Sequence, residues 1–339
     1  MNIRFDLPDE LSASAPPEAR GLARDEVRLL VASPSGVHHS VFASLAEHLR
    51  PGDLLVVNTS GTLPAAVDAR RAGRPIVVHF ATSLDDGAWI VELRAPGGPL
   101  LDGRPGERLE LPGGASLTLL SPAVPGAARL WRAAVAVPVD GGVTAFLAAA
   151  GRPIRYGYVP RAWPLSDYQT VFAREPGSAE MPSAARPFTS ALVTRLVTEG
   201  VLFAPLLLHT GVSSPEAGEP PQAERFRVPA TTAALASWVR TRGGRVIAVG
   251  TTAARALESA VSGGEVHAAE GWTDLVLGPD RPARVVDGII TGLHAPEASH
   301  LLLLEAVAGR ELVQRAYDAA VERRYLWHEF GDVSLLLRR

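Results

Sequence analysis

The stretch RVIAVGTTAARALESA, from Arg245 to Ala260, decides the fold of this chain. Its apolar start predicts a buried strand, and its Ala-rich end predicts a helix. Between them, Gly250 permits a tight turn, and a threonine can cap the helix that follows. A strand that enters a helix through such a turn is the repeating unit of an α/β fold.

The same turn is a candidate binding site. The first amides of a helix attract a carboxylate or a phosphate, and Arg255 and Glu258 lie one helical turn apart on one face. One interpretation is that Thr251, Thr252 and Arg255 hold an anionic or zwitterionic ligand. The other, which the spacing alone favours, is an ordinary helix cap beside a surface ion pair.

Strand and helix patterns alternate through residues 151–339. The apolar stretches predict strands at 201–210, 283–293 and 332–337, and the intervening stretches predict helices at 190–200, 231–244, from about Pro296, and at 311–325. This alternation predicts a mostly parallel sheet with helices packed against it. Ligands of such sheets bind at the carboxyl ends of the strands.

The first half of the chain follows two different patterns. Residues 1–63 predict a strand, a helix over 40–49 capped by Ser40, and a second strand. Residues 64–150 contain short strands separated by Asp-Gly and Gly-Gly turns, which is typical of a small barrel or sandwich. We therefore expect a large α/β domain of residues 1–63 and 151–339, interrupted by an inserted β domain of residues 64–150.

Polar motifs follow several predicted strands. His294 comes directly after one of them, and Pro296 suits the first turn of a helix that would carry Glu297. A histidine and a glutamate that converge there could do acid–base work, or they could form a polar turn in which Glu297 complements the helix dipole. His209 ends another apolar strand, where a lone histidine is more often a hydrogen-bonded structural residue.

The composition excludes several kinds of chemistry. The chain has 339 residues, no cysteine, and 33 basic residues that are all arginine. Thiol catalysis, zinc–thiolate sites, Schiff bases and a lysine base are therefore excluded. The nine histidines show no metal-binding spacing, so we expect no metal. The net charge of −3 argues against a non-specific nucleic-acid binder, and the lack of a signal peptide or membrane span predicts a cytoplasmic protein.

Six stretches together resemble one family, the S-adenosylmethionine:tRNA ribosyltransferase-isomerases of queuosine biosynthesis. They are FDLPDEL, GDLLVVNTSGTLPA, YQTVFAREPGS, VGTTAARALES, HAPEAS and the FGD of residues 330–332. The resemblance implies a large α/β domain interrupted by a β-barrel domain. It implies an enzyme that transfers the ribosyl group of S-adenosylmethionine to 7-aminomethyl-7-deazaguanine in tRNA and isomerises it to epoxyqueuosine, with release of adenine and methionine.

The resemblance also implies roles for particular residues. Thr251, Thr252 and Arg255 would anchor an anionic group such as the methionine carboxylate, and Glu258 would bind the ammonium group or brace Arg255. The remaining candidates are catalytic His209, His294 and Glu297; cofactor-binding Asn58, Thr59 and Gly250; and substrate-binding Tyr168, Gln169, Pro182, Ser183 and Asp332. The scheme requires no metal and uses S-adenosylmethionine as the ribosyl donor.

The chain departs from the family pattern in several loops. Ser60 stands where the family usually has an arginine or lysine, Pro187 stands at a histidine position, and Gly292 replaces an asparagine. Three hypotheses follow. They are the family enzyme acting on tRNA, an enzyme of the same fold that uses S-adenosylmethionine or another nucleoside with a small-molecule acceptor, and a non-catalytic nucleotide- or RNA-binding protein. The retained His294 favours an enzyme, whereas the altered loops favour a changed acceptor over tRNA.

Overall fold

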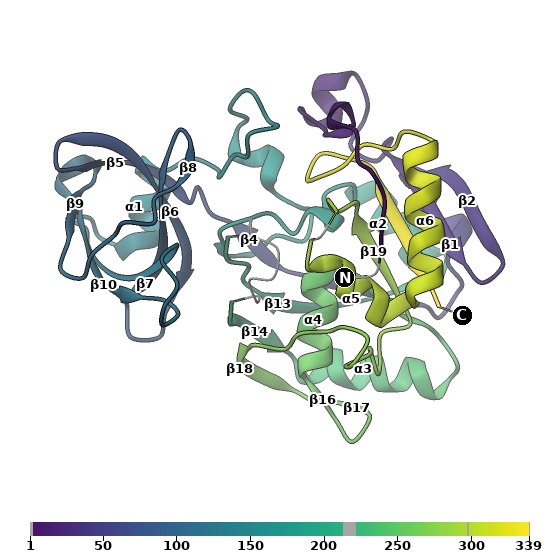
Figure 1. The fold of residues 1–339 in the computed structure, drawn as a ribbon. Coiled ribbons are helices and arrows are strands. Elements are labelled where there is room, and N and C mark those ends of the chain that lie inside the picture. Colours follow the sequence, from purple (N-terminus) through teal and green to yellow (C-terminus); the bar gives the residue numbers. More distant parts are fainter. Residues whose placement is uncertain (1–2, 213–221, 297, 339) are drawn as a thin grey trace.

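The computed structural model describes residues 3–212, 222–296 and 298–338 of the chain. Figure 1 shows two parts, a small β-barrel and a larger α/β body through which the first and last parts of the chain run. The predicted fold class, an α/β body with an inserted barrel, is confirmed. The domain boundaries at residues 64 and 150 stay a prediction.

A nine-stranded mixed sheet forms the centre of the large body. Its strands, in order across the sheet, are β18 (Ala269–Thr273), β14 (Glu224–Val228), β13 (Leu202–Leu208), β3 (Leu54–Asn58), β15 (Val246–Val249), β19 (Gly288–Gly292), β20 (Val333–Leu337), β1 (Arg28–Ser33) and β2 (Gly36–Val41). The run from β13 to β19 is parallel. Four pairs are antiparallel: β20 with β19, β14 with β13, β14 with β18, and β2 with β1. The sheet is therefore parallel at its centre and mixed towards its edges, which corrects the prediction of a mostly parallel sheet.

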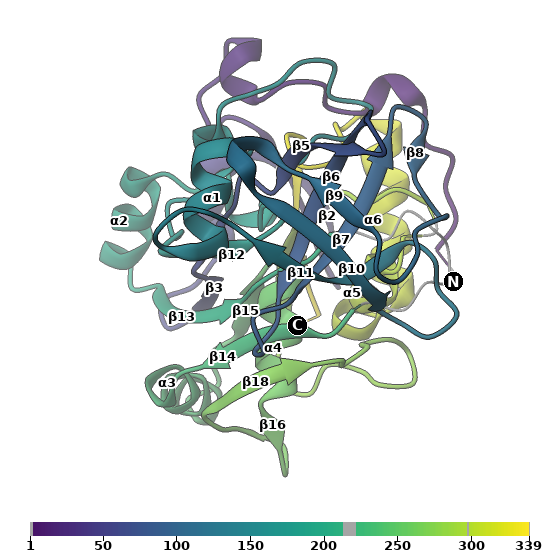
Figure 2. The same cartoon turned by 90° about the vertical axis from the view of Figure 1, so that its left-hand side faces the viewer.

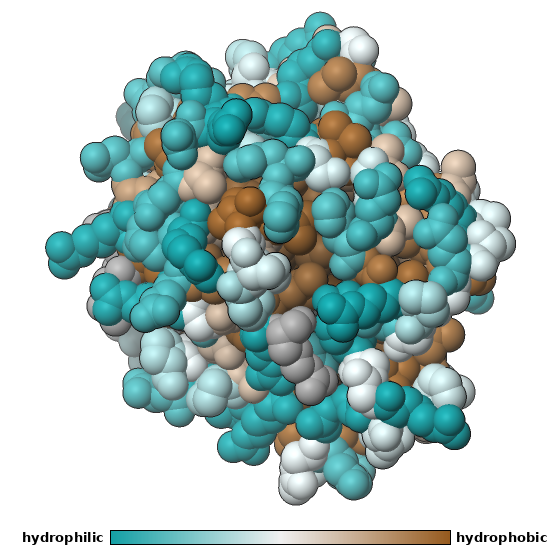
Figure 3. Space-filling view, turned by 90° about the vertical axis from the view of Figure 1, so that its right-hand side faces the viewer, coloured by the Kyte–Doolittle hydropathy of each residue, from teal (hydrophilic) through white to brown (hydrophobic). Residues whose placement is uncertain are grey.

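Alternate side chains of the central strands face two separate cores. Leu54 and Val56 pack beneath one group of helices, whereas Leu55 and Val57 pack on the opposite face. The first face is covered by α3 (Ala230–Thr241), α4 (Thr251–Ser259), α5 (His300–Ala308) and α6 (Arg310–Glu322), and the second by α2 (Ser190–Thr198) and η3 (Phe42–His48). Burial on both faces explains why these strands are continuously apolar. On the α6 and β2 side, the outer surface is mainly hydrophilic (Figure 3).

The smaller part of the chain is a closed six-stranded barrel, seen from its own side in Figure 2. Around the barrel the strands are β5 (Ala66–Arg71), β6 (Arg74–Ser83), β7 (Trp89–Ala95), β11 (Leu130–Ala136), β10 (Ser116–Pro122) and β9 (Arg108–Glu110). Closure comes from β11, which pairs with both β10 and β7. The short strand β8 (Gly98–Pro99) pairs antiparallel with the end of β7, and α1 (Gly142–Ala150) packs its Phe146 and Leu147 into the barrel core.

Short elements complete the chain. Strand β4 (Ser60–Thr62) pairs in parallel with β12 (Glu175–Ser178), and β16 (Val261–Ser262) forms a hairpin with β17 (Glu265–Val266). The remaining 3-10 turns are η1 (Asp9–Leu11), η2 (Pro17–Arg20), η4 (Pro112–Gly114), η5 (Leu165–Tyr168) and η6 (Ser183–Ala185).

Two predicted helices differ from the structure. Ser40 does not cap a helix, because it lies in β2 and pairs with Leu29 of β1. The chain continues from β2 directly into the 3-10 helix η3, so pairing along β1 has overridden the local helical pattern. The helix predicted to begin near Pro296 begins at His300.

The side chain of Asn58 joins three elements where the chain leaves the sheet for the barrel. It is fully buried at the end of β3. Its Nδ2 donates to the Leu208 carbonyl oxygen (2.8 Å) and to Thr252 Oγ1 (3.3 Å), and its Oδ1 accepts from the amides of Leu208 (3.0 Å) and Ser60 (3.1 Å). This amide therefore connects β3 to β13, to the start of α4 and to β4.

We expect Asn58→Ala to lower the free energy of unfolding by about 3 kcal/mol, because it leaves buried backbone groups of Leu208 without partners. Urea unfolding followed by circular dichroism measures the change. Thr241→Ala is the control, since Thr241 is exposed and its hydroxyl bonds to the Trp238 carbonyl oxygen of its own helix end. We expect it to cost at most about 0.5 kcal/mol. Equal effects of the two substitutions would contradict the assigned role of Asn58.

Candidate active site

A cavity of about 590 Å³ lies between the barrel and the large body. The barrel side contributes residues such as Arg129 and Ile154, and the large body contributes the starts of α4 and α5 and the end of β19. A cavity of this size can enclose a ligand as large as a nucleoside derivative. It lies at the carboxyl end of β15 and β19, where the sequence predicts ligand binding.

The predicted turn after β15 forms part of the cavity wall. Gly250 has φ 94° and ψ 157°, a conformation that favours glycine, and no side chain caps the helix. The amides of the first turn of α4 therefore lack intrahelical partners. Gly250, Thr251 and Thr252 all line the cavity, so the predicted anion-binding turn faces it.

Arg255 also lines the cavity, but most of its hydrogen-bond donors are engaged within the protein. Its Nη1 pairs with Glu224 (2.5 Å), and its other nitrogens donate to the carbonyl oxygens of Gln222, Thr273 and Leu275. Burial raises the pKa of Glu224, and the positive charge of Arg255 opposes that shift. Arg255 thus holds two loops of the cavity wall together, and little of its donor capacity remains for a ligand.

Glu258 lies outside the cavity lining and is 1% exposed. Its Oε1 accepts hydrogen bonds from three successive amides, those of Arg284, Val285 and Val286, at 2.8–3.0 Å. Its Oε2 lies 3.5 Å from Arg281. Glu258 therefore fixes the segment that leads into β19, and the expectation that it binds a ligand or braces Arg255 stays a prediction.

His294 is placed where a base could reach a ligand. It lines the cavity, its Nε2 is 3.0 Å from Thr291 Oγ1, and its ring stacks on that of His300 with centroids 4.5 Å apart. Burial, and then the neighbouring His300 and His328, hold the pKa of His294 well below its ordinary value. His294 is therefore a neutral imidazole at pH 7, the form that accepts a proton.

The other two predicted catalytic residues are not brought beside His294 by the described structure. The His209 ring is 2.7 Å from Ser60 Oγ and packs against the backbone at Gly177. It lies outside the cavity lining, and burial lowers its pKa. This is the structural role that the sequence pattern alone favours for a lone histidine. Glu297 lies outside the described residues.

The predicted binding residues divide into two groups. Tyr168, Pro182 and Ser183 line the cavity. The others serve the fold: Asn58 as described above, Thr59 through a bond to the Leu206 carbonyl oxygen, Gln169 through two bonds to the backbone of Thr62, and Asp332 through an ion pair with Arg28. Asn58, Thr59, Gln169 and Asp332 lie outside the lining of the large cavity, and their roles in ligand binding stay a prediction.

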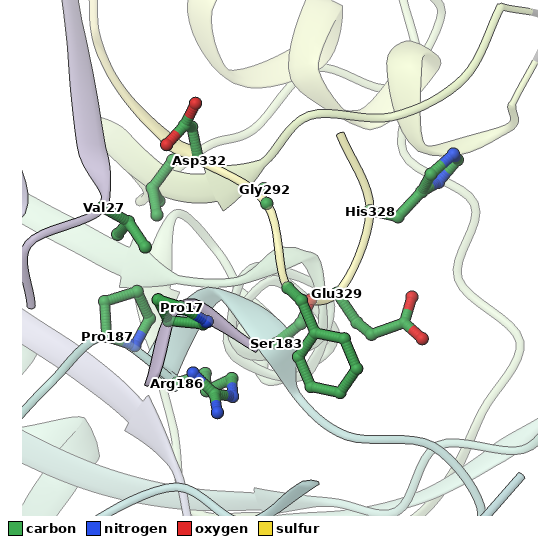
Figure 4. Close-up of a pocket in the computed structure, with 12 residues that line it drawn as sticks. Pro17, Val27, Ser183, Arg186, Pro187, Gly292, His328, Glu329 and Asp332 are labelled. Carbon is green, nitrogen blue, oxygen red and sulfur yellow. The ribbon is translucent and has the colours of Figure 1, made fainter. Parts of the chain in front are cut away.

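Asp332 belongs to a small pocket that adjoins the large cavity, shown in Figure 4. The two share the residues Ser183, Gly292, His328 and Glu329. Arg186 also lines the small pocket, and its fully buried guanidinium bonds to Glu18 and to the Asp167 carbonyl oxygen. The loop in which the sequence departs from the family pattern is therefore held by internal contacts.

Several cavity residues escape prediction from the sequence. The stretch RYGYVP supplies Tyr156 and Tyr158, and the stretch WHEFGD supplies His328 and Glu329. The alternate tyrosines and the polar pair just before the FGD motif were available as a signal. The sequence gives no sign that these residues lie side by side, because the two stretches are distant in the chain.

The described part of the chain contains neither a metal-binding cluster nor a helix suited to span a membrane. Within residues 3–212, 222–296 and 298–338, no group of three or more histidine, aspartate or glutamate side chains is arranged to hold a metal ion. None of the helices in that part of the chain is long and apolar enough to cross a membrane.

Comparisons with known proteins extend over almost the whole chain. Residues 1–336 match the model of the family described as "Queuosine biosynthesis protein". The S-adenosylmethionine:tRNA ribosyltransferase-isomerase of Symbiobacterium thermophilum is 35% identical over 98% of both chains, and that of Acidithiobacillus ferrooxidans is 37% identical over 99% of this chain and 97% of its own.

A solved structure gives the same result. The crystal structure of S-adenosylmethionine tRNA ribosyltransferase from Thermotoga maritima matches with a TM-score of 0.56 and 30% identity, covering 99% of each chain. The resemblance stated from the motifs is confirmed by these matches. The chain belongs to the queuosine biosynthesis protein family.

Proposed function

We propose that this chain is an S-adenosylmethionine:tRNA ribosyltransferase-isomerase. It would transfer the ribosyl group of S-adenosylmethionine to 7-aminomethyl-7-deazaguanine in tRNA and isomerise it, with release of adenine and methionine. Relatives of that name are 33–37% identical over nearly the full length of the chain. The observation that carries the proposal is that Thr251, Thr252 and His294, from separate family motifs, line one large cavity.

The start of α4 is suited to the carboxylate of the methionine part of the donor. Its first amides form the positive end of the helix dipole, and Thr251 and Thr252 add hydroxyl groups. Arg255 supports this end of the cavity by fixing the loops around it. In this proposal Arg255 acts as a positioning residue and the helix start makes the direct contact.

His294 is suited to remove a proton from the ribose. The sulfonium group acidifies the adjacent C5′ position, and the reaction requires a base there. A neutral imidazole held by Thr291 and stacked on His300 has a fixed orientation. In the tautomer whose Nε2 donates to Thr291, the Nδ1 lone pair is the one that would accept the proton. Among the described cavity residues, His294 best combines these properties.

A second candidate function keeps the donor and changes the acceptor. It is favoured by the loop at Ser183–Pro187, whose Arg186 is occupied by Glu18 and Asp167. A small-molecule acceptor would not require the basic and histidine side chains that the chain lacks in its loops. A purely binding protein would bind the donor without any turnover.

Incubation with S-adenosylmethionine separates these functions. We expect free adenine and methionine, detected by mass spectrometry, only when tRNA carrying 7-aminomethyl-7-deazaguanine is added. Release without tRNA would favour another acceptor or simple cleavage. Binding of the donor without release would indicate a non-catalytic protein, and would overturn the proposed function.

We expect His294→Gln to slow adenine release by roughly a hundred- to ten-thousand-fold, because the proton acceptor is lost. Single-turnover kinetics with saturating donor measures this. The matched control is His38→Gln, at an exposed position on the edge strand β2, which should leave the rate unchanged. A folded His294→Gln protein, shown by an unchanged melting temperature, that retains near-normal release would remove His294 from the mechanism.

The pH dependence of the same reaction follows from the lowered pKa of His294. The neutral ring is the active form, and its folded-state pKa lies well below the ordinary 6.5. The single-turnover rate should therefore stay level as the pH falls to 6.5 and decline only below it. A rate that has already fallen to half its plateau at or above pH 6.5 would contradict a neutral, buried His294 as the base.

A further inference from the structure

A row of aromatic rings forms one wall of the cavity. The rings of Tyr158 and His328 stack with centroids 4.1 Å apart and planes 14° apart, and Tyr156 stacks on Tyr158 at 5.9 Å and 18°. The hydroxyl of Tyr156 donates to Glu180, and that of Tyr158 donates to Glu329. We call these five residues, which all line the cavity, the acidic aromatic wall.

Glu329 is a half-buried carboxyl group on the cavity wall, without a cationic partner among the described residues. Among the described residues, its side chain accepts a hydrogen bond from Tyr158, and none of the described arginines or histidines forms an ion pair with it. In Figure 4 its side chain extends away from Arg186, which is engaged by Glu18. Burial raises the pKa of Glu329, as expected for a carboxyl group that lacks a counter-charge.

The backbone holds this wall in an unusual conformation. His328 has φ 72°, in the left-handed region that non-glycine residues seldom adopt. The loop is fixed by bonds from the Gly331 amide to the His328 carbonyl oxygen and from the Asp332 amide to that of Leu326. Strain of this kind persists where the surroundings enforce it, and it often marks a functional site.

The wall adjoins the proposed base. The amide of His328 donates to the Leu293 carbonyl oxygen, and His328 lies near enough to His294 to lower its pKa. A ligand against the wall would therefore lie beside the residue that we propose to act on the donor.

We propose that Glu329 binds the primary amine of the acceptor, and that the heterocycle of the acceptor lies against the acidic aromatic wall. Aromatic rings provide a stacking surface for such a heterocycle. An ammonium group supplies the positive charge that the Glu329 carboxylate lacks within the protein. This assignment rests on the proposed function and names the part of the cavity that recognises the second substrate.

A binding titration tests the subsite without any turnover. The probes are 7-aminomethyl-7-deazaguanine and its 7-ethyl analogue, in which a methyl group replaces the amine, each titrated calorimetrically into the full chain. We expect the wild type to bind the amine more tightly by roughly ten- to a hundred-fold, because a buried charge-assisted hydrogen bond is formed. Glu329→Gln should abolish this preference while binding of the ethyl analogue is retained.

Two further variants separate recognition from folding. Tyr158→Phe keeps the ring and removes the hydroxyl, so it should retain the preference for the amine. Glu265→Gln, at an exposed position in the β16–β17 hairpin, is the matched control and should behave as the wild type. Melting temperatures report whether each variant is folded.

The proposal is overturned if the wild type does not prefer the amine, including the case in which it binds neither probe, or if Glu329→Gln keeps the preference. Loss of the preference in Tyr158→Phe would also overturn the assignment to Glu329. Adenine release from the wild type with modified tRNA is measured separately. Release by a wild type that shows no amine preference would leave the proposed function intact and remove only the acceptor subsite.

Discussion

The buried amide of Asn58 is the interaction on which the rest of the structure depends. It makes four hydrogen bonds at the end of β3, to β13, to Thr252 and to the backbone that leads into β4. That point is both the carboxyl edge of the sheet and the place where the chain departs for the barrel. A buried amide with every polar atom satisfied has one favourable geometry. The position of α4 and the direction of the barrel entry are therefore fixed by the same side chain.

Buried charges then hold the walls of the cavity. Glu258 takes three backbone amides at the entry to β19, and Arg255 takes three carbonyl oxygens and Glu224 from two loops. Both side chains lie on α4, whose start is itself part of the wall. Because Arg255 and Oε1 of Glu258 already bond to the protein, these groups do not need to reorganise when a ligand enters. Charged residues of a motif can thus serve a reaction by fixing the shape of its site.

The sequence predicts the α/β body, the inserted barrel and the placement of the Thr251 turn and His294 at the sheet edge, because each depends on a local pattern. It fails where pairing at a distance decides the outcome. Ser40 enters a strand because β1 is available to it. Arg255 and Glu258 share a helix face in sequence, but their partners lie in loops that local spacing cannot locate. The stack of Tyr158 on His328 joins residues separated by most of the second half of the chain.

The cavity has opposite electrostatic preferences in different parts of its wall. The start of α4 favours an anion, whereas Glu329 lacks a cation. His294, near His328, is kept neutral by burial. A neutral imidazole forms no ion pair with Glu329 and is not drawn to the start of α4. Burial, and not an ion pair, therefore sets the proton affinity of His294. On the proposed function, this separation directs the donor's carboxylate and the acceptor's amine to different regions. The uncharged imidazole then remains free to meet the carbon-bound proton.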